Sequence, residues 1–191
     1  MLLKEKRNLI RELRLKEEIG IAIKQDMSEK QAKIIYLSVG SNLGNRKKNI
    51  EKTKFELYSK GINIIRSSNY YETLSWPNPK NPKFYNIILK VSSNLKILEL
   101  LKICKQIETS LGRKKAPKNS PRICDIDIID YNQKITSNGI NVPHPRMHLR
   151  NFVLIPLFEI EKNWGYPNSK LYIKDLIFSL SNSDIRSIKL I

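Results

Sequence analysis

The order in which strand and helix patterns alternate between residues 34 and 130 constrains the fold of this chain more than any other feature. Segments rich in β-branched and aromatic residues predict strands, and apolar residues spaced three or four positions apart predict helices. Gly61 and Gly112 mark the ends of the two predicted helices. The predicted strands are 34–39, 62–66 continuing towards 71, 86–91 and 122–130, and the predicted helices are about 46–60 and 95–111.

This β-α-β-β-α-β order is typical of the ferredoxin-like arrangement. It is an α+β fold in which the helices pack on one face of an antiparallel sheet. The strand at 86–91 is almost continuously apolar, so we expect it in the centre of the sheet. Residues 74–83, which contain three prolines, and residues 113–121 predict two long loops. A short helix at about 152–160 and a loosely patterned tail follow.

The first 33 residues differ from the rest of the chain. They contain no proline and no aromatic residue, and their apolar residues form only a weak stripe. We therefore predict an N-terminal arm at 1–33, helical or disordered, and one domain at 34–191. Because the arm has no motif that carries chemistry, we expect residues 1–26 to be dispensable for catalysis, with Met27 a candidate for the true start.

Composition narrows the class of protein only partly. The chain has 35 basic and 18 acidic residues and a formal net charge of +17, which attracts nucleic acid, anionic membranes or polyphosphates without choosing among them. No apolar run approaches the ~20 residues that span a bilayer. Cys104 and Cys124 are expected to be free thiols in the core, and the N-terminus resembles neither a signal nor a transit peptide. We therefore expect a cytoplasmic protein.

The sharpest local signal is a pair of aspartates, Asp125 and Asp127. Alternate residues of a strand project to the same face, so both carboxylates should lie on one side. Mg²⁺ takes one or two protein carboxylates and completes its octahedron with water and phosphate oxygens. The alternative is a polar stripe that faces solvent. Arg122 and the cationic loop before it favour a complex of Mg²⁺ with a polyphosphate.

Two further segments carry candidate binding groups. Residues 142–150 hold both histidines, two arginines and two prolines, a composition that suits either phosphate binding or a rigid loop. Phe84 and Asn86, with Tyr71 and Trp76 in the adjoining segment, can sandwich and read a flat heterocycle. The alternative is that these rings plug the edge of the core.

Taken in order, these motifs resemble the 6-hydroxymethyl-7,8-dihydropterin pyrophosphokinase family. The resemblance covers about residues 34–160, in seven segments: 40–46, 71–73, 84–86, 112–113, 121–129, 142–146 and 156–160. It implies the ferredoxin-like fold and, in folate biosynthesis, transfer of the β,γ-diphosphate of ATP to the hydroxymethyl group of the dihydropterin, with release of AMP. It also implies two Mg²⁺ ions and a monomer that binds neither nucleic acid nor membrane.

The resemblance further implies the roles of individual residues. The two metal ions would be held by Asp125 and Asp127, which with Arg113 and Arg122 form the catalytic set. ATP would be bound by Arg113, Arg122, Ile128, Ile140, His144 and Arg150. The pterin would be bound by Gly40, Thr73, Trp76, Phe84, Asn86 and Phe152. Loops 74–83 and 113–120 would act as mobile lids, and departures from the family pattern at Lys115, Lys118, Asn119 and Ser120 bear on closure and affinity.

Two other classes of function are alternatives to this one. The RNA recognition motif shares the topology, but its central strand carries stacking aromatic residues, which 86–91 lacks, and an acidic pair repels RNA phosphates. A protein-interaction scaffold of the same fold would bind neither Mg²⁺ nor ATP.

Overall fold

The computed structural model describes residues 14, 15, 17, 18, 31–114, 116, 117 and 119–191. The chain divides into two units, Met1–Ala32 and Lys33–Ile191. Residues 14, 15, 17 and 18 are helical. The rest of the predicted arm up to residue 30, including Met27, lies outside the described residues, as do Lys115 and Lys118 of the second predicted lid. The roles proposed for the arm and for these two lysines stay predictions.

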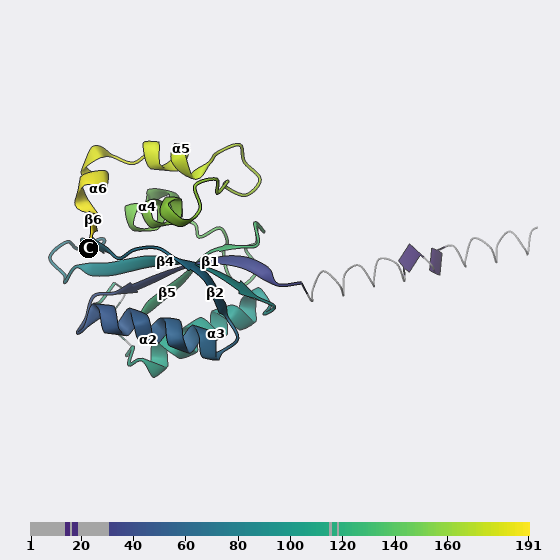
Figure 1. Cartoon of the computed structure of the whole chain (residues 1–191), viewed down its shortest axis with the longest axis horizontal. Helices are drawn as coiled ribbons and strands as arrows, with labels where there is room; N and C mark the ends of the chain where they lie inside the picture. The colour runs from purple at the N-terminus through teal and green to yellow at the C-terminus, as the bar shows by residue number, and fades with distance from the viewer. Residues whose placement is uncertain (1–13, 16, 19–30, 115, 118) are drawn as a thin grey trace, which may run out of the picture. The chain divides into compact units, whose positions relative to one another are not determined.

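The larger unit is built on one antiparallel sheet (Figure 1). Its strand order is β5–β1–β4–β3–β6, and β2 pairs with β4 off this path. The predicted second strand is divided at Ser68, which exchanges hydrogen bonds with the backbone of Ile88 through its own N–H and its hydroxyl. The strands are β1 (Lys33–Ser41), β2 (Asn63–Ser67), β3 (Tyr71–Thr73), β4 (Phe84–Ser93), β5 (Asp125–Tyr131) and β6 (Lys189–Leu190).

Two long helices, α2 (Arg46–Ser59) and α3 (Ile97–Ser110), cover one face of this sheet (Figure 1). The Asn45 side chain caps α2 by accepting a hydrogen bond from the N–H of Lys48, at 3.0 Å. Alternate strand residues point into the core beneath the helices, together with both cysteines, which are free and buried: Ile35, Leu37, Val39, Ile87, Leu89, Val91, Cys104 and Cys124. The predicted α+β class, the central position of the 86–91 strand and the free thiols are confirmed.

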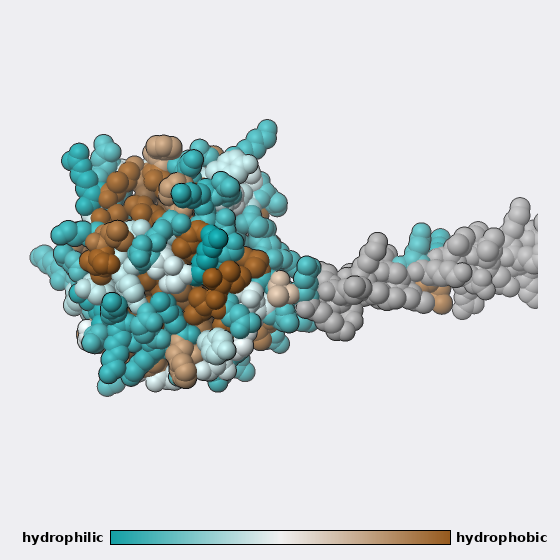
Figure 2. Space-filling model, viewed as in Figure 1, coloured by the Kyte–Doolittle hydropathy of each residue, from teal (hydrophilic) through white to brown (hydrophobic). Residues whose placement is uncertain are grey.

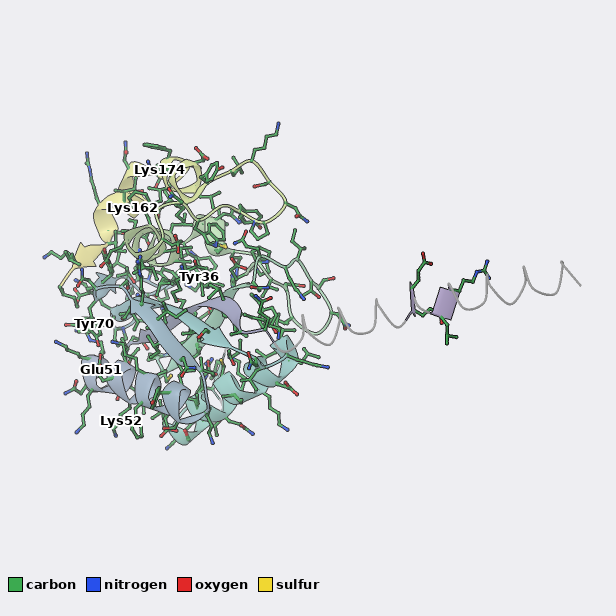
Figure 3. The ribbon with its side chains drawn as sticks, turned by 45° about the vertical axis from the view of Figure 1, so that its right-hand side comes forward. Tyr36, Glu51, Lys52, Tyr70, Lys162 and Lys174 are labelled. Atoms are coloured by element: carbon green, nitrogen blue, oxygen red, sulfur yellow. The ribbon has the colours of Figure 1, made fainter. Side chains whose placement is uncertain are left out.

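The opposite face of the sheet is also covered. The predicted helix at about 152–160 is confirmed there, and two further short helices that the sequence did not predict follow it. After the 3₁₀ turn η1 (Met147–Leu149) come α4 (Asn151–Ile160), α5 (Ile173–Phe178) and α6 (Asn182–Ser187). Tyr36, Ile88 and Ile129 of the strands pack with α4, α5 and Trp164 in a second buried cluster. Figure 3 shows Tyr36 between the sheet and this layer, where its hydroxyl donates to Glu161 Oε2 at 3.1 Å.

On the face of this unit that Figure 2 shows, hydrophilic residues surround groups of apolar residues. Single exposed apolar residues such as Phe55 on α2 and Phe178 on α5 are ordinary features of protein surfaces. In the described part of the chain, no helix combines the length and apolarity needed to cross a bilayer.

The second buried cluster can be tested by truncating Ile88. Its side chain is fully buried on the face covered by α4 and α5, so Ile88→Ala should lower the free energy of unfolding by about 2–5 kcal/mol. Ile65→Ala, at a position 48% exposed on β2, is the matched control and should cost much less. Urea titration of both variants measures the difference. A loss for Ile88→Ala no larger than for Ile65→Ala would contradict a packed second face.

Candidate functional site

The site begins with the two carboxylates of β5. Asp125 pairs with Gly40 of β1 and Asp127 with Ser38. Between them, Ile126 is buried in the core under α2 and α3. Because the strand alternates, both aspartate side chains point away from that core, and both line the same two cavities. The predicted placement of both carboxylates on one face of the strand is therefore confirmed.

Two arginines hold Asp125 from different segments. Arg113 Nη1, from the turn after α3, lies 2.8 Å from Asp125 Oδ1, and Arg122 Nη2 lies 2.6 Å from Asp125 Oδ2. Among the described residues, Arg122 Nε is the one buried side-chain nitrogen or oxygen without a hydrogen-bond partner. A buried donor of this kind is costly unless a ligand satisfies it. The arginine thus offers an N–H to an anion in the site.

Asp127 has its own cationic partners. Arg150 Nη1, just before α4, lies 2.9 Å from Asp127 Oδ2, and His144 Nε2 lies 3.9 Å from the same oxygen. Burial by itself raises the pKa of Asp127, but His144 when protonated and Arg150 outweigh burial and hold the pKa below its usual range. Burial, aided by Arg150 and Arg146, lowers the pKa of His144 despite Asp127, so the free imidazole is neutral near pH 7.

These groups line a cavity of about 600 Å³, a size typical of small-molecule sites. Its wall contains both carboxylates and seven basic side chains: Lys105, Arg113, Lys114, Arg122, His144, Arg146 and Arg150. The fold therefore brings together every arginine and histidine that was predicted to bind phosphate. Ile128 and Ile140 do not line it. The side chain of Ile128 is buried in the core, and Ile140 is half-buried against the same core, so their predicted contacts with a nucleotide stay predictions.

A narrow slot adjoins this cavity. It is lined by the six residues that the family resemblance implies for the pterin: Gly40, Thr73, Trp76, Phe84, Asn86 and Phe152. Tyr71, which was also expected beside a flat heterocycle, does not line the slot, and its hydroxyl donates to Glu159 Oε2 at 2.9 Å. Pairing of β3 with β4 sets Thr73 opposite Phe84, and Asn86 Nδ2 donates to Thr73 Oγ1 at 2.8 Å. Asp125, Asp127, Arg122 and Arg150 line both the slot and the cavity, so the two are parts of one site.

Gly40 is needed where β1 passes beneath the slot. A Cβ atom there would lie 2.8 Å from Asn86 Oδ1 and 3.3 Å from Phe84 Cδ1. The first distance is shorter than a non-bonded contact allows, so any side chain at this position would displace Asn86. The absence of a side chain at residue 40 thus keeps the amide and the ring in place.

Sequence reasoning missed Glu108 on α3, which is 1% exposed. Its Oε1 accepts the N–H of Ile126 at 2.8 Å, between the two aspartates, and its Oε2 lies 2.6 Å from Arg113 Nη1. The carboxylate thereby fixes both the strand that carries the two aspartates and an arginine. The available signal was an acidic residue beside Ile107 and one turn after Cys104, on the buried side of the helix.

Comparison with known proteins agrees with the geometry. Residues 36–162 match the family model described as 7,8-dihydro-6-hydroxymethylpterin-pyrophosphokinase (HPPK). The chain is 39% identical to the folic acid synthesis protein FOL1 of Dictyostelium discoideum over 150 residues. This match covers 78% of this chain and 23% of that protein. It is 36% identical to the 2-amino-4-hydroxy-6-hydroxymethyldihydropteridine pyrophosphokinase of Aquifex aeolicus over 142 residues. This match covers 74% of this chain and 88% of that protein.

The chain thus spans less than a quarter of the FOL1 relative but most of the Aquifex relative. Solved structures with a similar fold include Plasmodium falciparum HPPK-DHPS wild type with pteroate, at a TM-score of 0.61 and 17% identity, over 76% of this chain and 42% of that one. Another is an HPPK-DHPS in complex with substrates, at a TM-score of 0.59 and 18% identity, over 78% of this chain and 43% of that one. At these identities, the likeness concerns the fold alone.

Proposed function

Because the chain belongs to the 7,8-dihydro-6-hydroxymethylpterin-pyrophosphokinase family, we propose that it transfers the β,γ-diphosphate of ATP to 6-hydroxymethyl-7,8-dihydropterin. The acceptor is the hydroxymethyl group, AMP is the other product, and the reaction is a step of folate biosynthesis. One observation carries the proposal. A cationic cavity with two carboxylates opens onto an aromatic slot, and four charged side chains line both. A polyphosphate in the cavity and a flat heterocycle in the slot would meet there.

In this reaction, the hydroxymethyl oxygen attacks the β-phosphorus in line and a proton is released. A new O–Pβ bond forms, and the bond from Pβ to the oxygen shared with the α-phosphate breaks. The protein must align the two substrates, offset the phosphate charge and exclude water. Arg113, Arg122 and Arg150 supply fixed guanidinium groups for phosphate oxygens. Neutral His144 can donate a hydrogen bond there without adding charge.

The slot supplies the pterin side of the site. Phe84 offers an aromatic face, and Asn86 offers an amide oxygen and an N–H edge. The Arg122 guanidinium carbon lies 5.3 Å from the Phe84 ring centroid, and that of Arg150 lies 5.3 Å from the centroid of Phe152. Each ring of the slot therefore borders an arginine of the phosphate cavity, which supports a shared site for both substrates.

We propose two Mg²⁺ ions at Asp125 and Asp127. The carboxylates lie on one strand face and are 19% and 29% exposed, which suits an ion that completes its shell with water and phosphate oxygens. In the described part of the chain, no group of three His, Cys, Asp or Glu residues forms a metal cage, so substrate would supply the remaining ligands. When bound, the ions neutralise phosphate charge and lower the pKa of the attacking hydroxyl.

The RNA-binding alternative needs an uncovered sheet face on which bases can stack. Here α2 and α3 cover one face, and α4 and α5 cover the other, where Tyr36 and Ile88 are buried. This double cover favours the enzyme. The monomeric state and the cytoplasmic location stay predictions, and size-exclusion chromatography of the full chain tests the first.

The direct test is product analysis. The full chain, incubated with ATP, Mg²⁺ and 6-hydroxymethyl-7,8-dihydropterin, should form AMP and the pterin diphosphate in equal amounts, identified by chromatography and mass spectrometry. Formation of ADP in place of AMP would contradict transfer of a diphosphate. EDTA should stop turnover, and added Mg²⁺ should restore it. Turnover that persists in EDTA would contradict the proposed metal dependence but not the transfer itself.

Phe84→Ala should weaken pterin binding far more than ATP binding. Loss of a stacking ring beside Asn86 costs about 1–3 kcal/mol, by analogy with base–aromatic stacks. Separate calorimetric titrations with 6-hydroxymethylpterin and with an ATP analogue measure the two effects. Phe55→Ala, at an exposed aromatic residue on α2, is the control and should change neither affinity. Equal losses for both ligands in Phe84→Ala would mean that this ring only plugs the core.

A further inference from the structure

Asn42, in the turn after β1, contacts both ends of the 74–83 loop and the segment just before β5. Its side chain is almost fully buried, with the residue 3% exposed. Its Nδ2 donates to Ser75 Oγ at 3.2 Å and to the carbonyl of Pro82 at 3.0 Å, and its Oδ1 accepts the N–H of Arg122 at 2.7 Å. Both amide hydrogens and the carbonyl oxygen are thus used. Asn42 was not among the predicted site residues.

On one side, Asn42 closes the base of the 74–83 loop. Ser75 and Pro82 lie at its two ends, and the Ser75 hydroxyl also donates to the Pro82 carbonyl, at 2.6 Å. The amide of Asn42 therefore binds both ends of the loop at once. The same loop carries Trp76, which lines the slot, so the position of the slot's wall depends on this closure.

On the other side, Asn42 fixes the backbone just before β5. Besides the bond from Arg122 to its side chain, the N–H of Asn42 donates to the carbonyl of Arg122 at 3.1 Å. These two bonds set the position from which the Arg122 guanidinium reaches Asp125 Oδ2, at 2.6 Å. They also hold the buried Nε that has no partner among the described residues. Placement of the phosphate-binding arginine thus depends on the residue that closes the loop.

We propose that Asn42 is a positioning residue that couples closure of the 74–83 loop over the pterin to the placement of Arg122 in the phosphate cavity. The inference rests on the proposed function. If loop closure and the placement of Arg122 are linked through one amide, then pterin binding strengthens nucleotide binding, and by reciprocity the nucleotide strengthens pterin binding equally. Asparagine suits this role because it offers two donors and an acceptor, whereas aspartate at neutral pH offers acceptors only.

The coupling is measured as a ratio of affinities. Binding of α,β-methylene-ATP with Mg²⁺, in which the bond to be broken is blocked, is titrated by calorimetry with and without saturating 6-hydroxymethylpterin. We expect the pterin to tighten nucleotide binding in the unmodified chain by about 5–150-fold, the usual range of such coupling. In Asn42→Ala the ratio should fall to about one, with each ligand alone still binding.

Asn49→Ala is the matched control. Asn49 donates from Nδ2 to Ser41 Oγ at 3.1 Å and to the Leu43 carbonyl at 2.8 Å, so its bonds stay close to the same turn and reach neither the 74–83 loop nor Arg122. This variant should keep the coupling ratio of the unmodified chain. Loss of coupling in Asn49→Ala as large as in Asn42→Ala would mean that any damage to the turn abolishes it, and would overturn the specific role of Asn42.

Two further variants keep the test decisive if Asn42→Ala does not fold. Ser75→Ala removes the two hydrogen bonds of the Ser75 hydroxyl, with Asn42 and with the Pro82 carbonyl, and leaves both bonds between Asn42 and Arg122. Asn42→Asp keeps an acceptor for the Arg122 N–H while losing both donors to the loop. Both should reduce the coupling ratio and leave nucleotide binding without pterin within a few-fold of the unmodified chain. Full coupling in both, or no coupling in the unmodified chain, would overturn the inference. Failure of the unmodified chain to form AMP and pterin diphosphate would instead refute the proposed function.

Discussion

Asp127→Asn should lower kcat/KM by about 10³-fold or more while the protein remains folded. If Asp127 holds the proposed Mg²⁺, its removal takes away stabilisation of the transition state worth several kcal/mol, and each ~1.4 kcal/mol is a factor of ten in rate. The substitution keeps the size of the side chain and one oxygen, so the contact with Arg150 can partly survive. Asp125→Asn should behave alike, because both carboxylates line the phosphate cavity and the slot.

Steady-state kinetics over a range of Mg²⁺ concentrations, with melting temperatures of each variant, measure this effect. Asp175→Asn serves as the control, since Asp175 lies on α5 and caps that helix by accepting the N–H of Tyr172 at 2.7 Å. It should retain nearly full activity. Near-normal rates for Asp127→Asn in saturating Mg²⁺ would show that this carboxylate does not bind the metal.

The second large effect is expected at Arg122. Arg122→Ala should lower kcat/KM by about 10²–10³-fold, because it removes both the fork that pairs with Asp125 and the buried Nε that we assign to phosphate. Arg122→Lys keeps the positive charge but loses the planar fork, so it should recover only a small part of the loss. A backbone fixed on both sides by Asn42 makes this arginine a rigid donor.

Lys114→Ala is the comparison within the same cavity. Lys114 also lines the cationic cavity, but it lies in the loop after α3 and carries a point charge on a flexible stem. Its loss should cost only a few-fold in kcat/KM. Matching losses in Arg122→Ala and Lys114→Ala would mean that the total charge of the cavity matters and that the fork of Arg122 does not.

The sequence alone determined those features that depend on local period. The almost continuously apolar run at 86–91 predicted a central strand, alternation along 122–130 predicted two aspartates on one face, and both are found. Local period needs only neighbouring residues, because the geometry of a strand or helix fixes which side chains share a face. The family resemblance added the residues of the slot and of the cavity. The fold brings all of them together except Ile128 and Ile140, whose side chains pack on the core.

Only the tertiary structure decided the features that depend on contacts between segments far apart in the sequence. The helix at 152–160 was predicted, but its place on the second face of the sheet was not, and α5 was missed because its six residues are too few to show a helical period. In the sequence, Asn42 lies in a segment that predicts only a turn, and Glu108 is one of several charged residues in a predicted helix. The side chain of Asn42 bonds to residues between 33 and 80 positions away along the sequence. The side chain of Glu108 bonds to the backbone of a residue 18 positions away. Local sequence spacing fixes the face on which a side chain lies, but only the packed chain decides which buried donors and acceptors satisfy one another.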